Sequence, residues 1–103
     1  MSLTENQKKH LRRLAHPLHP IVMVGNAIGE PGKLAAITRE LDGALSSHEL
    51  VKVRARLADR AARDTVFDTL IKATHSELVQ RIGNVGVFYR SNQEKPKIML
   101  PDA

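Results

Sequence analysis

The chain has 103 residues, a length that suits one domain, and it contains no cysteine, which excludes disulfides, thiol nucleophiles and thiolate metal sites. Hydrophobic residues make up 42% of the chain, enough for one core, but no run of about 18 apolar residues exists that could cross a membrane. The formal net charge of +5 favours a polyanionic partner, nucleic acid above all, and the lack of an apolar leader predicts a cytoplasmic protein.

The chain opens with a predicted helix that is followed by a short strand. Thr4 and Gln7 have the spacing of a capping box, in which a hydroxyl and an amide satisfy free N–H groups at the start of a helix. The helix is expected to run to about Ala15, because Pro17 forces the residue before it out of the helical region. The apolar run 20–24 then predicts a buried strand.

A loop and a second helix are expected after this strand. Residues 25–32 are rich in glycine and other turn formers, which predicts a loop. Pro31 suits the first position of a helix, where its missing N–H costs nothing. The helix is expected to bury an apolar stripe with helical spacing, formed by Leu34, Ile37, Leu41 and Leu45.

Residues 50–57 alternate between apolar and basic side chains, which predicts a strand with one face on the core and one face in water. Like charges on one strand face repel each other, and no acidic residue of the same strand relieves them. RNA phosphates would relieve this repulsion, and the basic face is therefore a candidate RNA contact. The two faces are Val51, Val53 and Ala55 on one side and Lys52, Arg54 and Arg56 on the other.

The rest of the chain is expected to form a third helix, a closing hairpin and a tail. Asp59 can cap the helix, whose inner face carries Val66, Phe67, Leu70 and Ile71. Two strands, 77–82 and 85–90, flank the turn formers at 83–84 and are expected to pair as a hairpin. The polar residues 93–103 are expected to form a mostly loose tail.

The predicted element order is α-β-α-β-α-β-β, which places the chain in the α/β class. Strands separated by helices are expected to pair in parallel through right-handed crossovers, and the final hairpin adds an antiparallel pair. We therefore expect one domain over residues 1–92, with a four-stranded mixed sheet packed with three helices.

No arrangement of residues in the sequence requires catalysis or a cofactor. His16 and His19 are the tightest pair of histidines, but a metal site needs further ligands in fixed geometry, and no acid is spaced to supply them. Neighbours such as those in 46–49 rarely converge on a reacting atom, so this Ser-Ser-His-Glu segment is interpreted as a helix end. We expect no enzyme activity, metal, cofactor or small-molecule substrate; the alternative is a small RNA-acting enzyme that uses the two histidines.

Basic and glycine-rich segments are candidates for binding RNA phosphates. Residues 25–29 lie between a strand and a helix start, where glycines allow close approach and free N–H groups attract anions, although a plain connection is the alternative. Aromatic residues make up only 3% of the chain, so phosphate and shape contacts are expected in place of base stacking. The candidate RNA-binding residues are Lys8, Lys9, Arg12, Arg13, Gly25, Asn26, Gly29, Lys33, Lys52, Arg54, Arg56 and Arg90.

Three segments of the sequence resemble one known family. Residues 11–25 read LRRLAHPLHPIVMVG, residues 48–54 read HELVKVR and residues 82–90 read IGNVGVFYR. Together they resemble, in the same order, the CRM (chloroplast RNA splicing and ribosome maturation) domain, and more narrowly its bacterial single-domain YhbY type. The family's G-x-x-G loop is altered, because Gly25 and Gly29 lie one residue further apart.

The resemblance implies a fold like the C-terminal domain of translation initiation factor three, with an added N-terminal helix. It also implies binding to structured ribosomal RNA, association with precursors of the large (50S) ribosomal subunit, and neither a cofactor nor catalytic residues. We expect a monomer that does not engage membranes. The alternative is a protein-interaction module that docks on a ribosomal protein or another assembly factor.

Overall fold

The first helix begins at a complete capping box. The computed structural model describes residues 3–103, and its helix α1 runs over Glu5–Ala15. The Thr4 hydroxyl accepts a hydrogen bond from the Gln7 backbone N–H at 3.1 Å, and the Gln7 side chain accepts one from the Thr4 N–H at 3.0 Å. The predicted helix and its capping box are confirmed.

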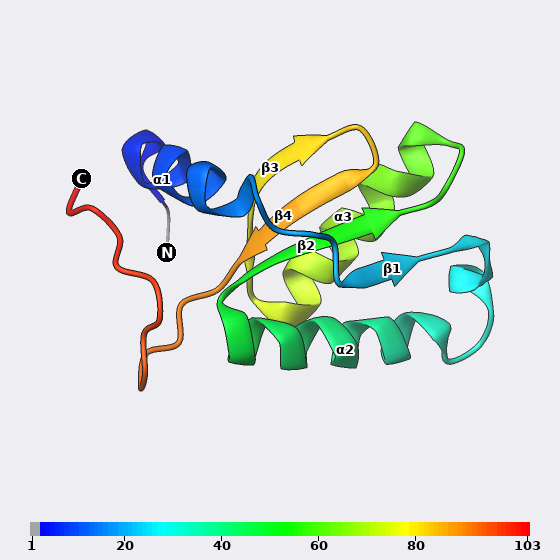
Figure 1. The fold of residues 1–103 in the computed structure, drawn as a ribbon. Helices are drawn as coiled ribbons and strands as arrows, with labels where there is room; N and C mark the ends of the chain where they lie inside the picture. Colours follow the sequence, from blue (N-terminus) through cyan, green and yellow to red (C-terminus); the bar gives the residue numbers. More distant parts are fainter. Residues whose placement is uncertain (1–2) are drawn as a thin grey trace.

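Four strands form one mixed sheet. They are β1 (Val22–Val24), β2 (Leu50–Ala55), β3 (Glu77–Ile82) and β4 (Val85–Tyr89). Their order across the sheet is β1-β2-β4-β3, with β1 parallel to β2 and β4 antiparallel to both of its neighbours (Figure 1). The predicted mixed sheet and closing hairpin are confirmed, but β4 lies between β2 and β3, so only β1 and β2 pair in parallel.

Two helices cover one face of the sheet. α2 (Lys33–His48) and α3 (Arg60–Thr74) pack there, which completes the predicted set of three helices around a four-stranded sheet (Figure 1). Phe67 of α3 meets Phe88 of β4 edge to face, with ring centroids 5.8 Å apart. The core on this face also contains Val22, Leu41, Leu45, Val51, Val53 and Leu70.

The connection from β1 to α2 differs from the prediction. A short 3-10 helix, η1 (Asn26–Gly29), occupies the loop, and α2 begins only at Lys33. Gly32 precedes α2 with a φ of 82°, a left-handed conformation that glycine adopts without strain and that interrupts the helical backbone. Pro31 therefore lies outside α2, and the prediction that it is the first helical residue is wrong.

Only part of the apolar stripe predicted on α2 is buried. Leu41 and Leu45 are fully buried and Ile37 is partly buried, whereas Leu34 is 37% exposed. Leu34 belongs to the first turn of α2, which lies beside η1 at the end of the molecule on the right of Figure 1.

The opposite face of the sheet is covered by α1 and by the segment that follows β4 (Figure 1). Leu11 of α1 is buried there with Val87 and Tyr89 of β4. Ile98 and Leu100 of the C-terminal segment pack against these residues. The sheet is thus sandwiched between α2 and α3 on one side and α1 with the C-terminal segment on the other.

A buried glutamate fixes the C-terminal segment. Glu49, at the junction of α2 and β2, is fully buried, and its carboxylate accepts the backbone N–H groups of Lys97 at 2.7 Å and Ile98 at 2.8 Å. Further along, the Gln7 side chain of α1 donates to the Pro101 carbonyl at 2.9 Å. A buried carboxylate needs such donors. The segment has no helix or strand, but it is fixed by these hydrogen bonds, so the prediction of a mostly loose tail is wrong.

Candidate nucleic-acid interface

The carboxyl ends of the two parallel strands lie side by side at one end of the sheet. Val24, the last residue of β1, pairs with Ala55, the last residue of β2, and the Ala55 N–H donates to the Asn84 carbonyl in the β3–β4 turn at 2.7 Å. η1 and the first turns of α2 and α3 lie at this same end, on the right of Figure 1. Carboxyl ends of parallel strands are a common ligand-binding position in α/β proteins. Residues 25–33, 54–63 and 81–84 are called the sheet end below.

Six of the predicted RNA-binding residues lie at the sheet end. The glycine loop is exposed, but Ile28 is partly buried against the core and anchors it. Arg56 follows β2 directly, with its backbone N–H bonded to the Val24 carbonyl at 2.8 Å and its side chain exposed. The six residues are Gly25, Asn26, Gly29, Lys33, Arg54 and Arg56.

Arg54 has a buried donor that lacks an acceptor. Its neighbours across the sheet are Met23 on β1 and Val85 on β4, neither of which offers a side-chain acceptor. Within residues 3–103, the Nε of Arg54 is buried without a hydrogen-bond partner. Leaving such a donor unsatisfied costs about 1–3 kcal/mol, so an anion bound here would be stabilised.

Three further arginines, which are not among the predicted RNA-binding residues, lie at the sheet end. Arg60 and Arg63 belong to the first turn of α3, and Arg81 comes from the end of β3; together with Gly83 they line one hollow. The positive end of a helix dipole disfavours cations in the first turn. The presence of two arginines in this turn, directly after the capping Asp59, is the feature of the sequence that could have drawn attention to this region.

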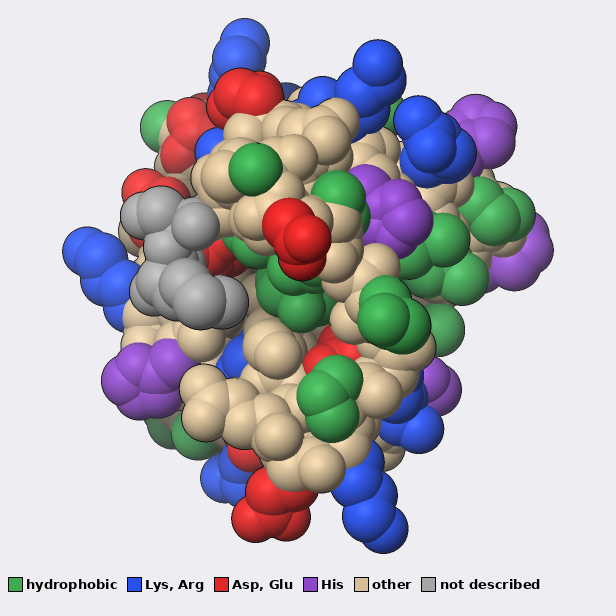
Figure 2. Space-filling view, turned by 90° about the vertical axis from the view of Figure 1, so that its left-hand side faces the viewer, with side chains coloured by type: hydrophobic (Ala, Val, Ile, Leu, Met, Phe, Trp, Pro, Cys, Tyr) green, Lys and Arg blue, Asp and Glu red, His purple; other side chains and the backbone are tan. Residues whose placement is uncertain are grey.

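The four basic residues predicted on α1 lie away from the sheet end. α1 packs over the opposite end of the sheet, on the left of Figure 1. The Nζ of Lys8 is 3.8 Å from a carboxylate oxygen of Glu5. Figure 2, which views this side, shows Lys and Arg interspersed with Asp and Glu rather than gathered in one patch. The structure therefore does not bring Lys8, Lys9, Arg12 and Arg13 together with the arginines of the sheet end.

Lys52 is engaged within the protein. Its Nζ donates to the carbonyl of Leu18 at 3.0 Å and to that of His16 at 3.4 Å, both in the link between α1 and β1. Lys52 is half-buried on the same strand face as Arg54, as predicted. Its ammonium group therefore holds the link in place. Of the three basic residues predicted on this strand face, Arg54 of β2 and Arg56, which follows β2, lie at the sheet end.

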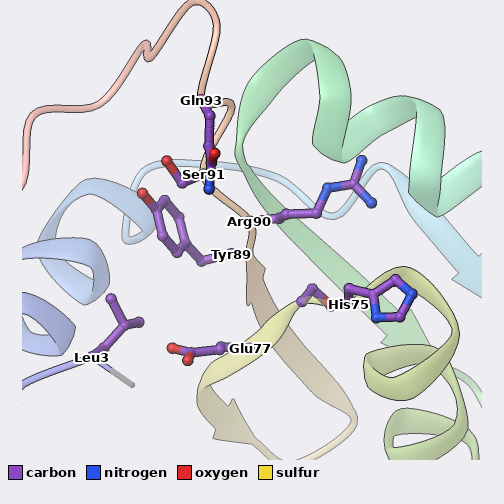
Figure 3. A pocket seen from close by; sticks show the side chains of 8 residues that line it. Leu3, His75, Glu77, Tyr89, Arg90, Ser91 and Gln93 are labelled. Carbon is purple, nitrogen blue, oxygen red and sulfur yellow. The ribbon is translucent and has the colours of Figure 1, made fainter. Parts of the chain in front are cut away.

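Arg90 is held against α2. Its Nη1 donates to the Asp42 carboxylate at 2.6 Å and to the Thr74 carbonyl at 2.8 Å, and its Nη2 donates to the Ser46 hydroxyl at 2.9 Å. Figure 3 shows the side chain extending toward α2, away from Tyr89. The structure thus gives Arg90, which was predicted to contact RNA, several partners inside the protein.

A larger hollow beside Arg90 is a poor phosphate site. It measures about 450 Å³ and is lined in part by Glu77 and Tyr89, both labelled in Figure 3. Burial raises the pKa of the Tyr89 hydroxyl; a hydrogen bond with Ser91 lowers it, and the charges of Glu49 and Glu77 raise it again. A carboxylate and an uncharged phenol do not attract an anion, and the guanidinium of Arg90, which also lines this hollow, is already paired with Asp42.

The residues considered for catalysis or metal binding are not brought together. His16 and His19 are exposed in the link before β1, and residues 3–103 contain no group of three His, Asp or Glu side chains placed to hold a metal ion. The Ser46 hydroxyl accepts from Arg90, while the Glu49 carboxylate is buried against the C-terminal segment. In the described part of the chain, no helix is long and apolar enough to span a bilayer.

Comparisons with known proteins agree with this architecture. The family model of the CRS1/YhbY (CRM) domain matches residues 3–90. An RNA-binding protein of Haemophilus influenzae is 37% identical over 100 residues, which cover 97% of this chain and 96% of the relative. A probable RNA-binding protein of Pseudomonas aeruginosa is 38% identical over 97 residues, which cover 94% of this chain and 89% of the relative. The solution structure of a hypothetical Staphylococcus aureus protein, described as an RNA-binding candidate, matches with a TM-score of 0.78 and 37% identity over 97% of this chain and 100% of its own. The chain belongs to the CRS1/YhbY (CRM) domain family.

Proposed function

We propose that this protein binds structured ribosomal RNA and serves as a non-catalytic assembly factor on precursors of the large ribosomal subunit, acting as a cytoplasmic monomer. The observation that carries the proposal is the sheet end, where an exposed glycine loop, two helix N-termini and several arginines from both faces of the sheet are found at the same end of the molecule. The names of the relatives, as RNA-binding proteins, support the same class of partner. The arginines concerned are Arg54, Arg56, Arg60, Arg63 and Arg81.

RNA would be held through its sugar–phosphate backbone. Arginine offers paired N–H donors that fit phosphate oxygens, and free N–H groups at helix starts attract the same anions. The aromatic residues, Phe67, Phe88 and Tyr89, are all buried, so they cannot stack on bases. Phosphate contacts of this kind recognise the shape of an RNA helix more than its sequence.

The second candidate function is a protein-interaction module that docks on a ribosomal protein or another assembly factor. A mainly apolar hollow of about 460 Å³ lies between the link after α1, the start of β2 and the C-terminal segment. Two of the side chains that line it, Leu18 and Ile21, are 41% and 53% exposed. Exposed apolar surface of this kind often marks a protein contact, but the charge of the sheet end favours RNA.

Equilibrium binding separates the two candidates. The dissociation constant is measured for a structured ribosomal RNA fragment and for a DNA duplex of equal length, over a series of salt concentrations. We expect tighter binding to the RNA and a steep loss of affinity with salt, because each neutralised phosphate releases counterions. Equal and weak binding to both nucleic acids would contradict the proposal.

A pair of matched variants locates the contact. Replacing Arg54 and Arg56 with Gln is expected to weaken RNA binding about tenfold, whereas the same replacement of Lys9 and Arg13 on α1, which removes equal charge, should have a smaller effect. RNase treatment of isolated precursor particles adds a second test. Release of the protein is expected if RNA holds it, and retention would favour docking on a protein.

A further inference from the structure

We infer that Arg60, Arg63 and Arg81 form a binding site for an RNA backbone phosphodiester, separate from the glycine loop. The inference rests on the proposed function, because it assigns one contact that such a function needs. The three side chains line a hollow of about 260 Å³ with Gly83 of the β3–β4 turn. Arg81 pairs with Gly86 across the hairpin and lies on the sheet face that α2 and α3 cover, so the hollow is on the other side of the sheet from Arg54.

Two of the three guanidinium groups are already held in place. Arg81 forms an ion pair with Asp64, and its Cζ lies 5.1 Å from the centre of the Phe67 ring. The Nη1 of Arg63 donates to the Leu57 carbonyl at 3.1 Å. A ligand therefore orders few additional side chains when it binds, which lowers the entropic cost of binding.

The positive charge around the hollow is only partly compensated. Asp64 is paired with Arg81, and Asp59 is engaged in capping α3. Partial burial, followed by the charges of Arg60 and Arg63, lowers the pKa of the Arg81 guanidinium. In the described part of the chain, the Nε of Arg63 is buried and has no acceptor. An anion in the hollow would reduce the repulsion between the guanidinium groups.

The lining of the hollow selects a phosphate group over a whole nucleotide. It consists of arginine side chains and a glycine, with no exposed apolar wall for a base, because the Phe67 ring beneath Arg81 is only 1% exposed. Guanidinium groups match two phosphate oxygens at once. Inorganic phosphate has the same chemistry, and the experiment below therefore includes it as a separate probe.

A double variant, Arg60→Gln with Arg63→Gln, tests the site and leaves the pair of Arg81 and Asp64 intact. The matched control, Lys72→Gln with Lys95→Gln, removes the same charge from exposed positions outside the site. Binding to the ribosomal RNA fragment is measured over the salt series, and thermal unfolding verifies that all proteins fold. We expect the arginine variant to bind about tenfold more weakly, with a log–log salt slope smaller by about two, and the control to change little.

The possible results distinguish a failure of the proposed phosphodiester site from a failure of the proposed function. If the wild type prefers RNA but the arginine variant keeps its affinity and slope, or the control loses as much, the site is overturned and the proposed function stands. If the wild type shows no preference for RNA over DNA, the proposed function fails and the inference fails with it. A shift of the Arg63 Nε–H signal in NMR on adding inorganic phosphate, without any effect of the variant on RNA binding, would identify a site for free phosphate and overturn the phosphodiester assignment.

Discussion

The Glu49 carboxylate accepts the backbone N–H of Asn92 at 2.5 Å, although the two residues are 43 positions apart in the chain. It also accepts the N–H groups of Lys97 and Ile98, so one buried side chain serves three donors of the C-terminal segment. A Glu49→Ala variant would leave all three without their acceptor. Hydrogen bonds to a charged group are individually worth about 1.5–3 kcal/mol, but the variant also removes the cost of burying the carboxylate, so we expect the free energy of unfolding to fall by about 3–5 kcal/mol.

Denaturant unfolding followed by circular dichroism measures this change. Glu94→Ala is the matched control, because Glu94 lies in the same segment with an exposed side chain. The control should unfold at the wild-type midpoint. Equal midpoints for the two variants would show that the carboxylate of Glu49 does not hold the segment.

Replacing Arg90 with Lys is expected to lower stability while RNA binding stays the same. A lysine keeps the charge but cannot reach the Asp42, Thr74 and Ser46 acceptors together, and we expect a loss of about 1–2 kcal/mol in the free energy of unfolding. Arg39→Lys, at an exposed position of α2, is the control. Unfolding and RNA titrations are run on both variants. A tenfold loss of RNA affinity at unchanged stability would instead support the prediction from sequence that Arg90 contacts RNA.

Two glycine-to-alanine variants should change stability in opposite directions. A Cβ at Gly86 would lie 3.0 Å from an atom of Phe88 and 3.2 Å from atoms of Leu78 and Phe67, inside the core. We expect Gly86→Ala to be destabilised by about 1–3 kcal/mol. Gly43 lies in α2 with nothing within 4 Å of its added Cβ, so Gly43→Ala should be stabilised by about 0.5–1 kcal/mol. Thermal unfolding compares the two, and a stabilised Gly86→Ala variant would contradict the packing described for β4.

Tyr89 gives the fold a dependence on alkaline pH. Its pKa is raised in the folded protein, mainly by burial, so the folded state favours the neutral phenol. This contribution to stability is complete below the pKa of tyrosine in the unfolded chain, about 10, and is lost as pH rises through the folded pKa. The chain has one tyrosine and no tryptophan, so absorbance of tyrosinate near 295 nm reports this group alone.

We expect the tyrosinate signal to rise at higher pH in the native protein than in the denatured protein. A Tyr89→Phe variant should lose the signal altogether, and its stability should depend less on pH above 10. Identical titration curves for native and denatured protein would rule out the buried environment assigned to this hydroxyl.

Much of the fold could be predicted because its signals are local. The capping box of Thr4 and Gln7, the Asp59 cap of α3 and the turn at 83–84 act over a few residues, and each occurs where it was predicted. The alternation along residues 50–57 also places Val53 in the core and leaves Arg56 exposed. Short-range periodicity and capping therefore identify the three α-helices and four strands, although not η1 or the start of α2.

The rest of the fold depends on contacts between distant parts of the chain. The sequence around β4 does not specify that β4 lies between β2 and β3. This order depends on which apolar strand faces pack together, and β2 is far from β3 and β4 in the chain. The interpretation of 46–49 as a helix end is confirmed, since α2 ends at His48 and Glu49 caps it, but the N–H donors of Glu49 lie more than 40 residues away and could not be predicted. Arg60, Arg63 and Arg81 become neighbours only when α3 folds against the hairpin, so a search for basic runs along the chain does not find them.

The two roles of Gln7 link the beginning of the chain to its end. Its side-chain oxygen accepts from Thr4 while its side-chain nitrogen donates to Pro101, so fraying of α1 and release of the C-terminal segment break bonds on the same residue. We therefore expect the two segments to open together, so that their amides have similar free energies of hydrogen exchange. The sheet end lies outside these two segments. We therefore expect that α1 and the C-terminal segment can leave the sheet face they cover while the arginines of the sheet end keep their geometry.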